Sequence, residues 1–364
     1  MNDFDVIIIG GGIAGASLGA EIAAHRRTLI VEGENACGYH STGRSAAFYL
    51  ESYGGPEVAK LTLASRDFLE SPPPEFADHG FLRQRGDLHL TKGDLPELPP
   101  QVTTRIVERE ELERLVPGVR AEWTRALLEP GCADIDVAAL HAAFLRSFRR
   151  HGGQILTDSR VVSGVREERA WRLALESGAE LRASIVVNAA GAWADHVAQS
   201  CAVEPLGIAP KRRTMVQLRV AQAGLRDLPL VDDAEGSFYF KGEGDQTVWL
   251  SPHDEIETEA CDAAPEEIDI ATAIDRFERV VDWPVERVER SWAGLRSFAP
   301  DRLPVYGYDF EAEGFFWCAG QGGFGIQTSP AAARLAAAML LRQEPHPSVA
   351  AIDPAIFSPR RFRV

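Results

Sequence analysis

The chain has 364 residues, of which 45% are hydrophobic and 25% are charged, as in ordinary soluble globular proteins. Its 38 basic and 54 acidic residues give a formal net charge of −16, which argues against nucleic acid or an anionic membrane as a partner. The length is sufficient for one large or two medium hydrophobic cores.

Cysteine usage and apolar patterning indicate a cytoplasmic protein. The five cysteines are scattered and contain no Cys-x-x-Cys pair, so we expect reduced thiols. We expect no integral membrane segment, because no apolar run approaches the length of a span; the alanine-rich stretch 331–341 is too short and contains Arg334. The first strand begins close to Met1, which leaves no room for a signal peptide. The predicted location is the cytoplasm or the periphery of the inner membrane.

Residues 5–32 have the pattern of a strand, a glycine-rich turn, a helix and a second strand. The turn follows an apolar run and has the spacing Gly-x-Gly-x-x-Gly, formed by Gly10, Gly12 and Gly15. An amphipathic helix is predicted over 14–25. The pattern is that of a βαβ unit.

This βαβ unit predicts a dinucleotide site. The first glycine permits a tight turn, the second lets the backbone approach a pyrophosphate, and the third lets helix and strand pack closely. The helix N-terminus offers free N–H groups and the positive end of its dipole to phosphates. The second strand, 28–31, ends at Glu32, which can accept hydrogen bonds from a ribose. A glycine triplet alone is a weak signal and also fits a turn without a ligand, but the five parts together are specific.

The next part of the chain alternates loops, helices and short strands. The loop 33–45 is rich in small and hydroxyl side chains, which suits a segment along a bound cofactor and also fits a plain surface loop. Helices are predicted over 57–69, 110–115 and 136–150, the last capped by Asp134 or Asp136. Strands are predicted over 83–90, 154–156, 160–165, 171–175 and 180–184, and a buried strand over 185–188 leads to a small-residue turn.

The character of the chain changes between 205 and 298. Longer strands are predicted over 212–220, 237–241, 247–250 and 285–297, with a helix over 268–281, which indicates a mixed sheet that covers the first domain. A final buried strand, 314–319, leads to the turn Gly320-Gln-Gly-Gly-Phe-Gly325 and a helix over 328–341.

Glycine-rich turns at both ends of the chain suggest one extended ligand that is held twice; the alternative for the second turn is close packing of helix on strand. FAD fits this arrangement better than NAD, because a helix N-terminus under the flavin would stabilise negative charge on the reduced ring. The predicted fold class is α/β: a Rossmann-like βαβ FAD domain plus a mixed-sheet α+β substrate domain. The predicted boundaries are 1–48, 137–207 and 298–364 for the discontinuous FAD domain, and 49–136 and 208–297 for the substrate domain.

Several longer segments are more selective than the glycine triplet. They include Gly-Tyr-His-Ser-Thr-Gly-Arg-Ser-Ala-Ala at 38–47, Trp-Ala-Gly-Leu-Arg-Ser-Phe at 292–298 and Gln-Gly-Gly-Phe-Gly-Ile-Gln-Thr-Ser at 321–329. Others lie at 133–136, 187–193 and 210–213. Nearly end to end, the chain resembles the FAD-dependent D-amino-acid dehydrogenases and oxidases, a family that includes glycine oxidase and sarcosine oxidase; bacterial D-arginine dehydrogenases are the nearest members.

The resemblance implies a set of FAD-binding residues in the two turns and the loop between them. They are Gly10, Gly12, Ile13, Ala14, Gly15, Glu32, His40, Ser41, Thr42, Ser45, Ala46, Val162, Gly191, Trp193, Gly322, Gly323, Gly325, Ile326, Gln327 and Thr328. Family members that tether FAD use a cysteine shortly after the arginine that corresponds to Arg296. Since 297–301 reads Ser-Phe-Ala-Pro-Asp, we expect non-covalent FAD. The histidines show no metal-ligand spacing, so no metal is predicted.

The resemblance also implies the chemistry: the α-hydrogen of an amino acid leaves as hydride to flavin N5, and water hydrolyses the resulting imine to a 2-oxo acid and ammonia. Arg296 matches the carboxylate-binding arginine and Arg213 a second active-site arginine; without the family, each would read as a surface or ion-pair residue. Tyr53 and Tyr239 match tyrosines that border the substrate, although Tyr239 also suits a core. No dedicated general base is evident.

Substrate preference is assigned to Asp87. It falls where D-arginine-preferring relatives carry a glutamate that pairs with the guanidinium, and a strand over 83–90 would put Arg83, Arg85, Asp87 and His89 on one face. The alternative is an ion-pair partner on the surface. Close relatives carry polar residues at Phe48 and Leu50, so this pocket is more apolar; Gly323 is also expected beside the substrate.

The predicted function is therefore FAD-dependent oxidative deamination of D-amino acids, with basic side chains preferred and apolar ones accepted. The alternatives are an oxidase or dehydrogenase of another small amine or hydroxy acid, such as glycine, sarcosine or 2-hydroxyglutarate, and a flavin-binding protein without turnover. The electron acceptor (a quinone, a dye-like acceptor or oxygen) is not specified by the sequence.

Overall fold

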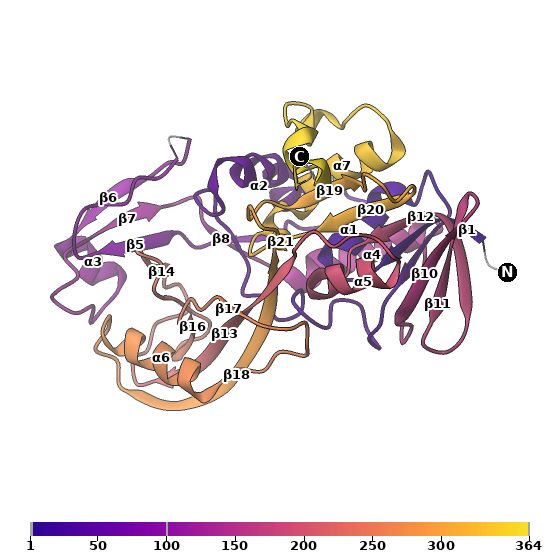
Figure 1. Ribbon diagram of the computed structural model, residues 1–364. Helices are drawn as coiled ribbons and strands as arrows, with labels where there is room; N and C mark the ends of the chain where they lie inside the picture. Colours follow the sequence, from indigo (N-terminus) through magenta and orange to yellow (C-terminus); the bar gives the residue numbers. More distant parts are fainter. Residues whose placement is uncertain (1–2, 100, 363–364) are drawn as a thin grey trace.

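The computed structural model describes residues 3–99 and 101–362, and it contains two large sheets and one small one (Figure 1). Residues 1–2 and 363–364, at the ends of the predicted FAD-domain ranges, lie outside the described residues. The fold is α/β, with a Rossmann-like FAD-binding part and a mixed-sheet part, as predicted. The exact domain boundaries stay a prediction.

The eight-stranded sheet has the order β10-β11-β12-β1-β2-β9, with β20 beside β12 and β19 beside β20. The strands β9, β2, β1, β12 and β20 run parallel. Its strands are β1 (Asp3–Ile9), β2 (Thr28–Val31), β9 (Gln154–Leu156), β10 (Val161–Glu167), β11 (Ala170–Leu175), β12 (Glu180–Asn188), β19 (Val305–Tyr308) and β20 (Phe315–Ala319). In β1, Val6, Ile7 and Ile8 are fully buried, because a parallel sheet is covered on both faces.

The ten-stranded sheet has the order β21-β18-β13-β16-β15-β14-β5-β7-β6, with β17 beside β13. Its strands are β5 (Asp87–Thr91), β6 (Arg105–Glu108), β7 (Arg125–Glu129), β13 (Ala209–Val220), β14 (Leu230–Asp233), β15 (Tyr239–Gly242), β16 (Thr247–Ser251), β17 (Ile256–Glu257), β18 (Val285–Phe298) and β21 (Gln321–Gly322). A three-stranded sheet lies between the two, formed by β3 (Phe48–Tyr49), β8 (Ala133–Ile135) and β4 (Leu82–Gln84).

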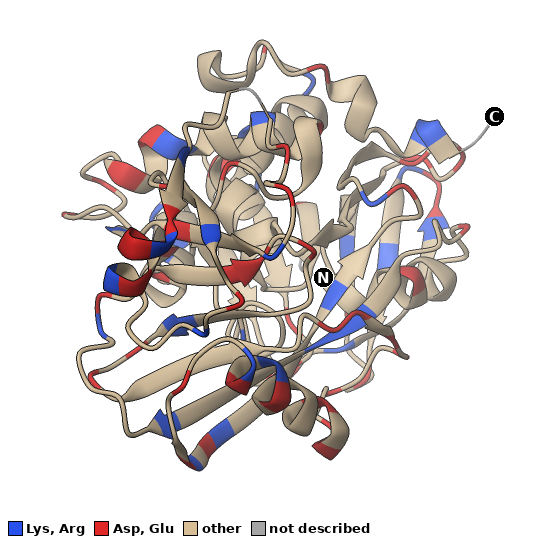
Figure 2. Cartoon of the chain, turned by 90° about the vertical axis from the view of Figure 1, so that its left-hand side faces the viewer, with Lys and Arg blue, Asp and Glu red and all other residues tan. Residues whose placement is uncertain are grey.

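The described helices are α1 (Ile13–Ile22), α2 (Gly55–Glu70), α3 (Arg109–Leu115), α4 (Val137–Arg150), α5 (Ala194–Ser200), α6 (Glu267–Glu278) and α7 (Gly325–Leu341). Four short 3-10 helices complete the described part: η1 (Gly191–Trp193), η2 (Pro347–Val349), η3 (Pro354–Phe357) and η4 (Pro359–Phe362). The helices α1, α4 and α7 pack together beside the parallel strands. Acidic and basic residues are interspersed over the outer strands and loops, whereas the central elements are largely uncharged (Figure 2).

Several predicted elements need correction. The helix α1 ends at Ile22 rather than at His25, and it is buried on nearly all sides rather than amphipathic, because the sheet, α4 and α7 enclose it. The strand β12 runs unbroken where two pieces were predicted. The predicted strand 83–90 is divided at Gly86, whose φ of +81° ends β4 and sends β5 into another sheet. The helix α7 begins at Gly325, three residues before the predicted start.

Asp136, rather than Asp134, is the N-cap of α4, where its carboxylate accepts a hydrogen bond of 2.9 Å from the N–H of Ala139. We expect Asp136→Ala to lower the free energy of unfolding by about 1 kcal/mol, because that N–H loses its partner. Asp136→Asn is the matched control, since an amide oxygen can still accept the bond. Chemical denaturation measures both, and an Ala variant as stable as the Asn variant would contradict the capping role.

Candidate active site

A cavity of about 610 Å³ lies where the carboxyl ends of β1, β2 and β12 meet the inner face of the ten-stranded sheet. Its wall on one side is formed by Gly10, Glu32 and Gly191, and on the other by Arg213 and Arg296. Ligands of open α/β sheets bind at this edge, because the turns there leave backbone groups free.

The first glycine-rich turn lets the backbone pack without side chains. Gly10 has a φ of +107°, and a Cβ there would lie 2.4 Å from the carbonyl oxygen of Ala189. A Cβ on Gly15 would lie 2.0 Å from the carbonyl oxygen of Gly10. Gly12 is the N-cap of α1 and has no side chain to cap the helix. Gly12, Ile13 and Ala14 line the cavity, so the N-terminus of α1 lies at its wall. Such a terminus is a ready anion site.

Neighbouring side chains fix the shape of this turn. The carboxylate of Glu32 accepts hydrogen bonds from the N–H groups of Gly11 at 2.8 Å and Glu34 at 3.0 Å. The hydroxyl of Thr42 accepts from the N–H of Ile13 at 2.9 Å, and the imidazole of His141 lies 2.9 Å from the Gly11 carbonyl oxygen. No role was predicted for His141, because only the tertiary fold brings α4 to this turn.

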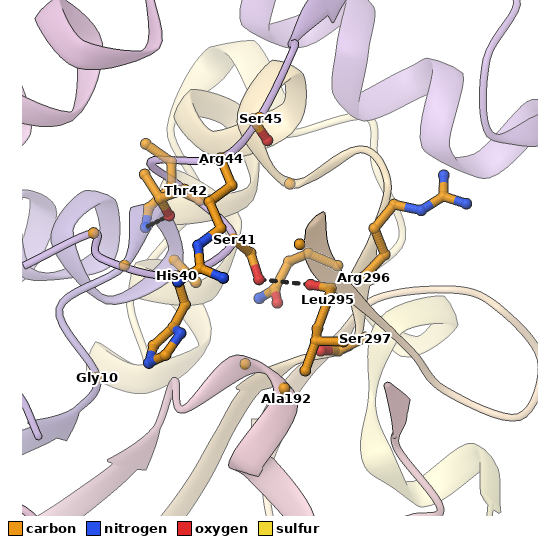
Figure 3. Close-up of a pocket in the computed structure, with 18 of the residues that line it drawn as sticks. Gly10, His40, Ser41, Thr42, Arg44, Ser45, Ala192, Leu295, Arg296 and Ser297 are labelled. Atoms are coloured by element: carbon orange, nitrogen blue, oxygen red, sulfur yellow. Dashed lines mark hydrogen bonds between the residues drawn. The ribbon is translucent and has the colours of Figure 1, made fainter. Parts of the chain in front are cut away.

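The loop after β2 lines the cavity, and its contact with a cofactor stays a prediction. The hydroxyl of Ser41 donates to the carbonyl oxygen of Leu295 at 2.5 Å, so this loop is tied to β18 (Figure 3). The ring of His40 lies 4.5 Å from the ring of Trp193, and its Nε2 lies 3.1 Å from the carboxylate of Glu34. The loop is therefore a wall of the cavity and not a free surface segment.

The second glycine-rich turn forms another part of the wall. Gly322 has a φ of +54°, and a Cβ on Gly323 would lie 2.4 Å from the Tyr53 hydroxyl and 2.8 Å from Nη1 of Arg296. The N-cap of α7 is Phe324, which makes no side-chain cap bond. The helix N-terminus therefore keeps N–H groups available beside the cavity.

Of the twenty predicted cofactor residues, all but three line the cavity. Gly15 packs behind the first turn. Val162 is 48% exposed on β10, and the hydroxyl of the buried Thr328 donates to the carbonyl oxygen of Phe324. Their predicted contacts with a cofactor stay untested.

The two predicted arginines lie together on the cavity wall. Arg296 donates from Nη1 to the Tyr53 hydroxyl at 2.8 Å and from Nη2 to the carboxylate of Glu255 at 2.5 Å. Arg213 donates from Nε to the carbonyl oxygen of Asp254 at 2.8 Å. Burial and the charge of Arg296 lower the pKa of Arg213 below its ordinary value. The carboxylate of Glu255 lies beside both guanidinium groups, 2.5 Å from Arg296 and 3.8 Å from Arg213, so this part of the wall accommodates an anion.

Each of these arginines keeps a buried nitrogen without a hydrogen-bond partner among the described residues: Nη2 of Arg213 and Nε of Arg296. Arg212 points to the opposite face of β13, as its adjacency to Arg213 predicts, and forms an ion pair with Asp269 at 2.8 Å. Arg213 and Arg296 line the cavity, whereas Arg212 does not.

Aromatic side chains border the arginine pair. The Tyr239 ring lies 5.8 Å from the Arg213 guanidinium, and the Tyr239 hydroxyl lies 3.0 Å from the sulfur of Met215. Phe48 and Leu50 also line the cavity, which makes this part apolar. No role was predicted for His253, which lines the cavity and has a φ of +57°. Burial and the charge of Arg213 lower the pKa of His253 to about 4, so it is neutral at pH 7.

Asp87 does not line the cavity. It is fully buried on β5, and the prediction that it shares one strand face with Arg83 and Arg85 is wrong, because the chain turns at Gly86. Asp232, on β14 of the same sheet, has a carboxylate that lines the cavity, as do Glu32 and Glu34 at the opposite wall. The sequence missed Asp232 because the short strand β14 was not predicted.

Asp87, His89 and Asp232 present ligand atoms within 4.8 Å of one another, a spacing that can hold a metal ion. The sequence showed no such spacing, because Asp232 is distant along the chain. No helix in the described ranges 3–99 and 101–362 is long and apolar enough to cross a membrane.

Comparisons with known proteins agree with this geometry. The family described as FAD dependent oxidoreductase matches residues 5–339. Glycine oxidase from Pseudomonas aeruginosa is 25% identical and covers 97% of this chain and 98% of its own. Mitochondrial dimethylglycine dehydrogenase from Rattus norvegicus is also 25% identical; the chain is covered over 96% but spans only 44% of that relative.

Two solved structures share the fold over nearly the whole chain. L-proline dehydrogenase from P. horikoshii has a TM-score of 0.84 at 20% identity and covers 99% of this chain and 98% of its own. Glycine oxidase from Geobacillus kaustophilus has a TM-score of 0.82 at 21% identity and covers 98% of each chain.

We expect Gly10→Ala to abolish or strongly weaken FAD binding, because the new Cβ would meet the Ala189 carbonyl and displace the turn. Gly178→Ala is the matched control: Gly178 also has a positive φ, of +83°, but a Cβ there has nothing within 4 Å. The absorbance of flavin that co-purifies with each variant measures the effect. Equal flavin content in the two variants would contradict the role of the turn.

Proposed function

The chain belongs to the FAD-dependent oxidoreductase family, and from that premise we propose that it is an FAD-dependent D-amino-acid dehydrogenase. The proposed reaction converts a D-amino acid to a 2-oxo acid and ammonia, with basic side chains preferred and apolar ones accepted. We also propose that it acts in the cytoplasm or at the periphery of the inner membrane.

FAD is the cofactor of this family, and the residues present fit it. A Cβ at Gly10 would collide with the Ala189 carbonyl oxygen, and a Cβ at Gly323 would collide with the Tyr53 hydroxyl. The N-termini of α1 and α7 both lie at the same cavity. Glu32 stands at the end of β2, where a ribose hydroxyl can reach its carboxylate. We expect the flavin to be non-covalent.

The observation that carries the proposal is the pair of arginines, Arg213 and Arg296, on the cavity wall next to the turn at Gly323. A planar guanidinium binds a carboxylate with two parallel hydrogen bonds. The carboxylate of Glu255 already contacts Arg296, at 2.5 Å, so this guanidinium is within reach of a carboxylate group. Burial acts to raise the pKa of Glu255, but Arg296 and Arg302 lower it, which keeps the side chain ionised.

The work of these residues is orientation. The chemistry supplied by FAD is acceptance of a hydride from the α-carbon. Arg296 and Arg213 fix the substrate carboxylate, while the Tyr53 hydroxyl, which accepts a bond from Arg296, holds that guanidinium in place. The rings of Tyr239 and Phe48 exclude water beside the α-carbon. The substrate amine must be neutral at the moment of transfer, and deprotonation through water or a tyrosine is sufficient.

A second candidate is an oxidase or dehydrogenase of a smaller amine. It is favoured by the end-to-end match with a protein named glycine oxidase. The preference for D-amino acids over this candidate rests on the resemblance of the 38–47, 292–298 and 321–329 segments. On either proposal the cavity of about 610 Å³ would hold both FAD and substrate, so its volume does not distinguish the two candidate functions.

We expect the bound flavin to lose its absorbance near 450 nm when D-amino acids are added without oxygen, because electrons then stay on the cofactor. D-Arginine, D-lysine, D-methionine and D-phenylalanine form the first set, their L-enantiomers the control, and glycine, sarcosine and 2-hydroxyglutarate the second set. If only the second set bleaches the flavin, the protein is an oxidase or dehydrogenase of a smaller amine or hydroxy acid, and the D-amino-acid proposal is wrong. No bleaching by any compound would indicate a flavin-binding protein without turnover.

We expect Arg296→Ala to lower kcat/KM for a D-amino acid by roughly 30-fold or more, since a buried charged partner is worth about 2–5 kcal/mol, with flavin content unchanged. Arg302→Ala is the matched control: Arg302 also contacts Glu255, at 3.0 Å, but it does not line the cavity. If both variants keep activity within threefold of wild type, Arg296 does not bind the substrate carboxylate.

A further inference from the structure

One face of the ten-stranded sheet carries opposite charges at its two ends. Arg296 on β18 pairs in register with Lys211, two residues from Arg213 on β13, so both arginines emerge on this face. Further along the sheet, Tyr239 on β15 is directly opposite Asp232 on β14. Directly paired residues of neighbouring strands share a face, so the cationic and acidic ends look into the same cavity.

The acidic residues continue from β14 onto the neighbouring strands β5 and β7, behind the cavity wall. Asp232 is paired in register with His89 on β5, and Asp87 on β5 is paired with Glu129 on β7. Nδ1 of His89 lies 2.8 Å from the carboxylate of Asp232 and 3.8 Å from that of Asp87. Its Nε2 lies 3.5 Å from the carboxylate of Glu129. One imidazole therefore stands among three carboxyl groups.

The cluster holds more acidic groups than basic ones. His89 is the basic side chain that the carboxyl groups of Asp87, Glu129 and Asp232 share, each within 4 Å of its ring nitrogens. Among the described residues, both carboxyl oxygens of Asp87 and one of Glu129 have no hydrogen-bond partner. A single imidazole therefore stands against three acidic groups.

Among the members of this cluster, only Asp232 reaches the cavity. Asp87, His89 and Glu129 are nearly or fully buried and do not line it, whereas the Asp232 side chain is 25% exposed and does. Asp232 shares its partner His89 with two other carboxyl groups, so a cation from the ligand would add a partner that the cluster lacks. Lys241, on the same sheet face, is already paired with Asp134 and Glu243, each at 3.0 Å.

We propose that Asp232 binds the cationic end of the substrate, in the role that the sequence assigned to Asp87, and that His89 is a positioning residue that fixes the Asp232 carboxylate. The substrate is then a molecule with a carboxylate at one end and an ammonium or guanidinium at the other. As a statement on side-chain preference, this inference rests on the proposed function.

The dimensions suit such a molecule. β13 and β14 are separated by β16 and β15, so their backbones are about 14 Å apart across the sheet. The Arg213 side chain shortens this span, because its guanidinium reaches to within 5.8 Å of the Tyr239 ring. The two binding groups therefore lie on either side of Tyr239.

The first test uses ligands without an α-amine, so that it does not depend on amino-acid oxidation. 5-Aminovalerate and valerate are titrated into the flavin-loaded protein, and the shift of the flavin absorbance gives each Kd. We expect 5-aminovalerate to bind wild type about 10- to 100-fold more tightly, as charge-assisted hydrogen bonds imply. Equal Kd values for wild type would overturn the proposal.

Two variants assign the preference to a residue. Asp232→Asn should remove the preference and leave the Kd of valerate within threefold; Asp232→Ser is the second variant if the first does not hold flavin. Asp87→Asn is the matched control and should keep the preference, because Asp87 does not line the cavity. Preference that survives in both Asp232 variants would overturn the assignment to Asp232. If the preference is lost in Asp87→Asn alone, the role returns to Asp87.

The second test measures kcat/KM for D-lysine and for D-norleucine, which has the same chain length without the terminal amine. Asp232→Asn should lower the ratio of the two by about 10- to 100-fold, mainly through D-lysine. If no D-amino acid is oxidised while 5-aminovalerate is still preferred, the proposed function fails and the assignment of Asp232 stands. An unchanged ratio overturns the assignment.

Discussion

The pairing of β18 with its two neighbours is the constraint on which the rest of the site depends. On one side β18 is in register with β13 along nearly its whole length, which brings Arg296 and Arg213 to one face. On the other side it pairs with β21, where Ser297 is opposite Gly322. A glycine turn, a helix N-terminus and two guanidinium groups are thereby fixed by backbone hydrogen bonds. Their positions need no flexible loop, which is the condition for preorganised binding.

The parallel sheet forms the other half of the site, where close packing of two backbones leaves no room for a side chain. Gly10 and Ala189 end two neighbouring strands, and the backbones there approach so closely that a Cβ cannot be accommodated. The helix α1 can therefore start directly behind the strand, with its N-terminus on the cavity. The loop that carries Ser41 then closes the space by bonding to Leu295 of β18. The two sheets are thereby joined at the cavity in which we propose that FAD binds.

Charge on the inner face of the ten-stranded sheet is arranged by strand order. The arginines stand on β18 and β13, and the acidic cluster stands on β14, β5 and β7, with β16 and β15 between them. The two charges are separated by the apolar ring of Tyr239, so they do not neutralise each other directly. Each keeps unsatisfied polar groups, which is unusual for buried side chains and typical of a binding site.

The sequence by itself determined the βαβ unit, the second glycine turn, the α/β fold class and FAD as the cofactor. Local patterns suffice for these, because apolar runs and glycine spacing act over a few residues. Adjacency within a strand likewise placed Arg213 and Arg212 on opposite faces. Only the tertiary structure showed that Asp232, and not Asp87, faces the cavity. Gly86 turns the chain, and β14 lies beside β5 although 143 residues separate Asp232 from its partner His89. Such long-range pairing leaves no periodic trace in either segment.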